Sequence, residues 1–199
     1  KYINAGISTD HECGDIEEAQ ERINMGMKIQ IREGSAAKDF NNLYPLINEF
    51  PDMVMLCSDD KHPDDLMESH VNGIIRKGLK NGLGKFNLLK AATINPTEHY
   101  KLNVGLLQEG DPADLIVIDN FEKFQVLQTY INGQLVFDKE ESLIQPVDTP
   151  ELNVMNVAHI REEDIRLEDK GIPVRVIEAM DNSLYTSSTE SFPFTSKGF

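Results

Sequence analysis

Hydrophobic and polar positions follow two different periods over the first part of the chain. Short apolar runs at residues 2–8, 27–31 and 53–57 are typical of strands, and the third is continuously apolar, as in a strand buried on both faces. Between and after these runs, apolar residues recur at helical spacing, for example behind the capping residue Asp15 and over residues 63–82. This alternation predicts an α/β fold with a parallel sheet covered by helices.

Polar and charged residues follow each predicted strand directly. Thr9–Glu12 comes after the first strand, Arg32–Ser35 after the second, and Ser58–Asp60 after the third. In α/β barrels the carboxyl ends of the parallel strands converge on one mouth, where active sites lie. Loops are polar in most proteins, so a single segment of this kind would mean little. Three in succession predict a functional mouth.

The pattern changes after residue 84. Residues 85–100 predict a pair of helices, and residues 113–118 predict a strand. Two further strand patterns flank Asn132-Gly133, which is the strongest short signal for a β-hairpin. The chain therefore passes from alternating strands and helices to a small module of β structure.

We divide the chain into three parts on this basis. Residues 1–100 hold three β/α units, residues 101–145 hold the β module, and residues 146–199 begin a partly irregular C-terminal domain with a strand pattern at 174–179. A closed eight-stranded barrel needs about 250 residues, so three units cannot close one. A different, open α/β fold is one alternative; we favour a piece of a longer barrel.

Charge and composition narrow the classes of function. The chain has 199 residues and a formal net charge of -15, which repels phosphate backbones and argues against a nucleic-acid partner. No apolar run approaches the ~20 residues of a membrane span, and no leader sequence opens the chain. Two cysteines do not make a disulfide framework, so we expect a reducing, cytoplasmic compartment.

His11 and Asp59 are the candidates for metal binding. Imidazole is the commonest protein ligand for transition metals, and the neighbouring carboxylates suit divalent cations. A carboxylate at a barrel mouth can also take a proton from an attacking water. Two alternatives stay open: His11 is a hydrogen-bonded turn residue, or Asp59 or Asp60 caps the helix that follows. Strand alternation does not say which of the two aspartates faces the mouth.

Arg32 and Glu33 follow the middle strand. They are candidates for ligand contacts because of their place at the predicted mouth. The alternative is a surface ion pair, or charges placed at the start of the next helix.

Several segments together resemble the bacterial adenine deaminases of the amidohydrolase superfamily. The resemblance covers about residues 1–140, and its specific part is the order and spacing of Thr-Asp-His-Glu and Arg-Glu-Gly-Ser. The segments that carry it are Ala5–Glu12, Arg32–Ala37, Ser58–Leu66, Ala92–Pro96 and Gly105–Val117.

This resemblance implies a fold and an activity. Residues 1–100 would be the last three β/α units of a (β/α)8 metal-dependent hydrolase barrel, followed by a β-sandwich segment at residues 101–145. The parent enzyme would convert adenine and water to hypoxanthine and ammonia, through attack of metal-activated hydroxide at C6 of the purine, in purine salvage. Its cofactor would be a binuclear centre of Mn(II) or Fe(II), with Zn(II) as the alternative, and the full-length protein would be a homo-oligomer.

The resemblance also implies roles for individual residues. His11 would be the metal-binding histidine after the sixth barrel strand, and Asp59 the metal-binding, proton-shuttling aspartate after the eighth. The adenine pocket would be lined by Arg32, Glu33 and Ser35, with Glu12 and Asp60. The chain departs from the family in having no His-x-His motif. We therefore predict that this chain alone is inactive.

Two other functions remain open. One is another cyclic amidohydrolase, similar to dihydroorotase or allantoinase, which a substrate panel would separate from an adenine deaminase. The other is a non-catalytic, acidic α/β interaction domain, which would unfold cooperatively as a complete unit.

Overall fold

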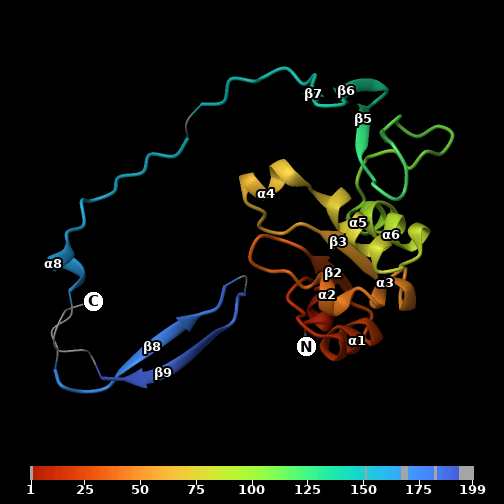
Figure 1. Cartoon of the computed structure of the whole chain (residues 1–199). Coiled ribbons are helices and arrows are strands. Elements are labelled where there is room, and N and C mark those ends of the chain that lie inside the picture. The colour runs from red at the N-terminus through yellow and green to blue at the C-terminus, as the bar shows by residue number, and fades with distance from the viewer. Residues whose placement is uncertain (1, 151, 167–169, 182, 193–199) are drawn as a thin grey trace. The chain divides into compact units, whose positions relative to one another are not determined.

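The computed structural model describes residues 2–150, 152–166, 170–181 and 183–192, and the chain divides into two compact units, Lys1–Ile144 and Gln145–Phe199 (Figure 1). The helices of the first unit are η1 (Ile3–Ala5), α1 (Ile16–Asn24), α2 (Phe40–Leu43), α3 (Leu46–Glu49), α4 (Pro63–Glu68), α5 (Val71–Lys80), α6 (Lys85–Ala92) and α7 (Ile94–Tyr100). Its strands are β1 (Thr9–Asp10), β2 (Lys28–Arg32), β3 (Val54–Cys57), β4 (Leu115–Ile118), β5 (Val126–Ile131), β6 (Gln134–Asp138) and β7 (Glu141–Ser142).

The first three strands form a parallel sheet in the order β1-β2-β3. The register pairs Asp10 with Ile29, and Arg32 with Cys57. Helices α1 and α2 contact β2, whereas α5 and α6 contact β3. The predicted α/β class is confirmed; within the part of the chain that the structure describes, this sheet is open and does not close into a barrel.

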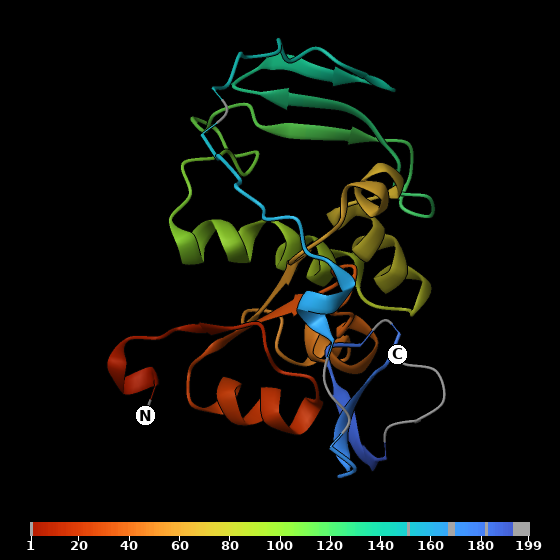
Figure 2. The same cartoon turned by 90° about the vertical axis from the view of Figure 1, so that its left-hand side faces the viewer.

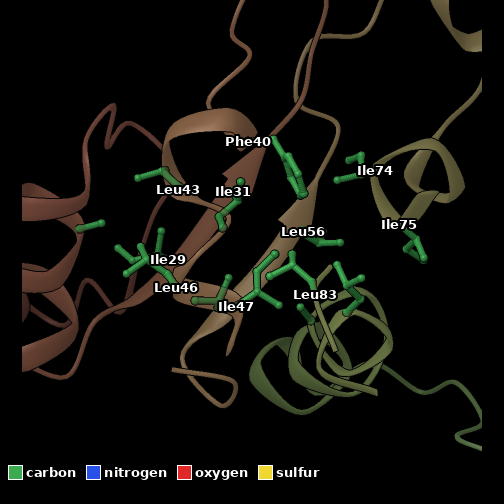
Figure 3. Packing of buried hydrophobic residues seen from close by; sticks show 14 of the residues in the cluster. Ile29, Ile31, Phe40, Leu43, Leu46, Ile47, Leu56, Ile74, Ile75 and Leu83 are labelled. Atoms are coloured by element: carbon green, nitrogen blue, oxygen red, sulfur yellow. The ribbon is translucent and has the colours of Figure 1, made fainter. Parts of the chain in front are cut away.

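The core lies between this sheet and its helices. Ile29 and Ile31 of β2 are fully buried, and Figure 3 shows them with Leu56 among the side chains of the helices. The helix side chains of this cluster include Phe40, Leu43, Leu46, Ile47, Ile74, Ile75 and Leu88. Burial of aliphatic and aromatic side chains of this size contributes about 1.5–3 kcal/mol each, so this layer is what fixes the strands in place.

The start of α1 follows the predicted cap. The Asp15 carboxylate accepts a hydrogen bond from the Glu18 amide at 2.8 Å. The Glu18 side chain pairs with Arg22 one turn later, at 2.7 Å, instead of returning to the cap. Both interactions stabilise the helix, since one supplies a partner to an otherwise unpaired amide and the other is an i,i+4 ion pair.

The first strand is shorter and later than predicted. The run at residues 2–8 holds the short 3-10 helix Ile3–Ala5, and the strand covers only Thr9–Asp10. Gly6, at φ 91°, turns the chain out of the helix, and Ile7 is exposed rather than buried in a sheet. The apolar residues of this run therefore never enter the strand.

The helix predicted over residues 63–82 is two helices, α4 and α5. Ser69 is extended and breaks the run, and the His70 amide donates to the Asn72 side chain at 2.9 Å as the second helix begins. Pro63 opens the first of them at a position where its missing amide hydrogen costs nothing.

The predicted hairpin is confirmed. Strands β5 and β6 pair antiparallel around Asn132 and Gly133, which both have positive φ angles (49° and 76°), as a tight two-residue hairpin turn requires. Strands β4 and β7 extend this into a four-stranded sheet, whose green to teal strands lie side by side in Figure 2. Phe124 ties the module to the main core, where it is 1% exposed.

The second unit holds α8 (Glu162–Ile165) and the antiparallel pair β8 (Val174–Ala179) and β9 (Thr186–Ser191). The predicted strand at residues 174–179 is confirmed. No helix among the described residues is long and apolar enough to cross a membrane.

Candidate functional site

The two faces of the parallel sheet carry different side chains. Ile29 and Ile31 point into the helix layer, so the alternate residues of β2, including Arg32, face the other way. Met55 of β3 is fully buried but lies outside the helix-facing cluster, as this alternation requires. Asp10 reaches the helix side, where Arg22 binds it at 2.5 Å, and this leaves His11 to the opposite face.

His11 and Asp59 meet at the carboxyl end of this sheet. The His11 Nε2 atom lies 3.9 Å from Asp59 Oδ1 and 3.1 Å from Glu12 Oε1. The His11 side chain is 45% exposed and the Asp59 side chain 27%, so both reach solvent. Asp59 adopts a left-handed backbone conformation, φ 51°, which a non-glycine residue takes rarely and which turns the chain directly after β3.

Arg32, at the end of β2, binds two carboxylates. Its Nε donates to Asp39 Oδ2 at 2.6 Å, and one of its terminal nitrogens donates to Glu12 Oε2 at 3.0 Å. The side chain is 7% exposed. Burial disfavours the charged guanidinium, but the hydrogen bond and charge of Asp39, with Glu12, outweigh it and raise the pKa of Arg32.

Glu33 lies on the helix side of the sheet. Its Oε1 accepts from Lys77 Nζ on α5 at 2.6 Å, and the same ammonium lies 5.3 Å from the centre of the buried Phe40 ring. Its Oε2 is buried and has no hydrogen-bond partner in the part of the chain that is described. The structure therefore does not bring Glu33 to the His11–Asp59 pair.

Ser35 links the loops that follow β2 and β3. Its hydroxyl donates to the Asp65 carboxylate and accepts from the His62 amide at 2.8 Å, and its amide donates to the Asp60 carbonyl at 3.0 Å. Gly34 permits this approach, because a Cβ atom there would lie 3.0 Å from the Asp60 carbonyl oxygen. Asp60 itself takes part through its backbone, and its residue is exposed.

The donor set at His11 and Asp59 fits part of a metal site. One imidazole and one carboxylate are ligands that Mn(II), Fe(II) and Zn(II) accept. Among the described residues, however, no group of three or more histidine, cysteine, aspartate or glutamate side chains is placed to hold a metal ion. Two donors leave most coordination positions open.

Three residues that bind the predicted site residues escaped the sequence reasoning: Asp39, Asp65 and Lys77. In the sequence, nothing distinguishes Asp39 and Asp65 from ordinary charges near helix starts, or Lys77 from a charge on a solvated helix face. No spacing rule pairs residues 44 positions apart, such as Lys77 and Glu33. Only the packing of α5 against β3 brings them together.

Both the sequence and the fold of this chain are similar to those of known proteins. The sequence profile of the Amidohydrolase family matches residues 3–136. The chain belongs to the amidohydrolase family. Over its whole length this amidohydrolase is 48% identical to a protein named adenine deaminase from Methanosarcina mazei, 38% of which it covers. It is 48% identical to an adenine deaminase from Salinibacter ruber over 94% of the chain and 34% of that relative.

The resemblance to adenine deaminases is thus confirmed, and the chain spans little more than a third of the length of these relatives. Two solved structures of a β-aspartyl dipeptidase from Fervidobacterium islandicum AW-1, one with a β-Asp-Leu dipeptide, match 67% of the chain with TM-scores of 0.50 and 0.51. The matched region covers 38% and 37% of those two chains, at 23% identity, and this likeness shows a shared fold only.

Proposed function

We propose that this chain is part of an adenine deaminase, which converts adenine and water to hypoxanthine and ammonia. The observation that carries the proposal is the 48% identity, along the whole chain, to a protein of that name. The site supports it, because an imidazole and a carboxylate lie together at the carboxyl end of a parallel sheet, the usual place for hydrolytic chemistry in barrel enzymes.

In this proposal residues 1–100 are the last three β/α units of the barrel, residues 101–145 a β-sandwich segment, and residues 146–199 the start of a C-terminal domain. The sheet order β1-β2-β3 and the four-stranded antiparallel sheet agree with such a division. The proposal also includes a homo-oligomer, as the resemblance to adenine deaminases implies, and a cytoplasmic location, which the free thiols of both cysteines favour.

His11 and Asp59 would hold part of a binuclear Mn(II) or Fe(II) centre, or a Zn(II) centre. When bound, the metals would supply Lewis-acid polarisation and an activated water. Asp59 would accept a proton from the attacking water and pass it toward the departing ammonia. Glu12, Ser35 and Asp60 would line the adenine pocket, while Arg32 is held in ion pairs beside His11, and Glu33 pairs with Lys77 on the helix side of the sheet.

The other metal ligands would come from the part of the protein that corresponds to the remaining length of the relatives. Only His11 and Asp59 meet at the mouth here, and two donors cannot complete a two-metal site.

A substrate panel tests the proposed function. The full natural-length protein, loaded with Mn(II), is assayed with adenine, dihydroorotate, allantoin and a β-aspartyl dipeptide. Release of ammonia from adenine, with no turnover of the other three, is expected. Turnover of dihydroorotate or allantoin in place of adenine would assign a different cyclic amidohydrolase, and no turnover of any would favour an interaction domain.

A further inference from the structure

We infer that Arg32 is a positioning residue: Asp39 holds it, and it fixes the place of His11 through Glu12 instead of touching the substrate. The inference rests on the proposed function for its catalytic meaning. Its physical basis is a continuous row of contacts from the start of α2 to the end of β3, and each contact is present among the described residues.

The row begins at Asp39, just before α2. Asp39 Oδ2 accepts from Arg32 Nε at 2.6 Å, and the Asp39 amide also donates to the Arg32 carbonyl at 3.1 Å. The Asp39 side chain is 14% exposed and that of Arg32 7%. This largely buried charge pair, together with the backbone hydrogen bond between the same two residues, leaves the guanidinium little freedom to move.

The row continues from Arg32 to the metal-site candidates. The guanidinium holds Glu12 Oε2 at 3.0 Å, and the second oxygen of that carboxylate lies 3.1 Å from His11 Nε2. Glu12 is otherwise a solvent-facing side chain, 65% exposed, which would have many rotamers without this anchor. Arg32 therefore determines where Glu12 and the His11 ring stand relative to Asp59.

Burial argues against direct contact between Arg32 and a ligand. A guanidinium that is 7% exposed presents almost no surface to a pocket, and its hydrogen bonds to Asp39 and Glu12 both go to carboxylates of this chain. Glu12 contacts His11 at Nε2, the ring nitrogen that also faces Asp59. Residues that fix the position of metal ligands through hydrogen bonds commonly change metal affinity by about 10- to 100-fold when they are replaced.

The test uses the full natural-length protein and Mn(II) alone as the probe, with free Mn(II) followed by electron paramagnetic resonance. Arg32→Met is expected to weaken Mn(II) binding by about 10-fold or more, and Asp39→Asn to weaken it by less in the same direction. Lys77→Met is the matched control, because it breaks an ion pair of the adjacent residue on the opposite face of the sheet. It should leave Mn(II) affinity unchanged.

Kinetics at saturating Mn(II) give the second readout. Arg32→Met should then leave the KM for adenine within about twofold of wild type, as expected of a residue without substrate contact. A raised KM with unchanged Mn(II) affinity would assign Arg32 to the substrate pocket and overturn the inference. Equal losses of Mn(II) affinity in Arg32→Met and Lys77→Met would also overturn it, since both would then report general destabilisation.

The experiments distinguish a failure of the proposed function from a failure of the role assigned to Arg32. Wild-type protein that binds Mn(II) but does not deaminate adenine would contradict the proposed function alone, and the Mn(II) titrations of the variants would still decide the role of Arg32. If Arg32→Met does not fold, Asp39→Asn decides it, because asparagine keeps the size of the side chain and removes only its charge. Unchanged Mn(II) affinity in Asp39→Asn would then contradict the inference.

Discussion

Asn95 shows how single polar residues hold the strands of this protein in place. Its side chain is 1% exposed, and its amide nitrogen donates to the carbonyl oxygens of Pro51 and Val54, each at 2.7 Å. These carbonyls flank the start of β3, and Asn95 is the second residue of α7. One side chain thereby joins the final helix of this layer to the strand that leads to Asp59.

Replacing Asn95 with alanine should destabilise the folded protein by about 2 kcal/mol, because it leaves one buried and one partly buried carbonyl group without this donor. Asn81→Ala is the control, since that asparagine is exposed at the end of α5 and uses its backbone amide for the helix end. Urea unfolding of both variants measures the difference. Equal unfolding midpoints for the two variants would show that the buried bonds contribute nothing.

The sequence predicted the strand ends as the place of the site, but not the direction of each side chain there. It placed His11 and Asp59 behind different strands, and the structure brings them within 3.9 Å. It could not choose between Asp59 and Asp60, because Asp59 leaves the extended conformation at φ 51° and strand alternation ends there. It also could not show that Glu33 turns to the helix layer, since that follows from its contact with Lys77.

Elements with unambiguous patterns were predictable from the sequence. Strand β3 is a continuous apolar run, and the β5–β6 hairpin has the turn residues Asn132-Gly133 that its geometry demands. The failures came where apolar residues had no fixed period. Residues 2–8 mix Ile with small residues and form a helical turn, and the break between α4 and α5 at Ser69 has no glycine or proline to mark it.

Asp114 joins the loop before β4 to the turn of the hairpin. Its Oδ1 accepts from the Asn132 amide at 2.8 Å and its Oδ2 from the Gly105 amide at 2.9 Å. These bonds, the first the larger, lower the pKa of Asp114 below its ordinary value of 3.8. The carboxylate form is thus favoured by folding, and its contribution to stability is present above pH 3.8 and is lost as the pH falls through the lowered value.

Asp114→Asn should therefore lower the melting temperature at pH 7, because the amide loses the charge and one acceptor oxygen. The difference from wild type should shrink as the pH falls below 3.8 and through the lowered pKa of the wild-type carboxylate. Differential scanning calorimetry over a series of acidic pH values measures this. A melting difference that stays constant over the whole acidic series would contradict the assigned role of the charge.

At the scale of the whole molecule, the sheet and its helices position a mouth that carries two potential metal ligands. The chain spans 38% of the Methanosarcina mazei relative and 34% of the one from Salinibacter ruber. A mouth lined by three strands gives His11 and Asp59 no third ligand among the described residues. In the proposed function these two residues belong to a site that only the complete protein assembles, so we expect no ammonia release from the 199-residue chain by itself.

The most direct measurement is ammonia release from adenine by the full natural-length protein with Mn(II), compared between wild type, Asp59→Asn and Asp64→Asn. Asp64 is the matched control, because its carboxylate is exposed in the first turn of α4, five residues from Asp59. We predict ammonia release by wild type and by Asp64→Asn, and a rate lower by about 100-fold or more in Asp59→Asn. Wild-type activity in Asp59→Asn, or no ammonia from wild type, would contradict this prediction.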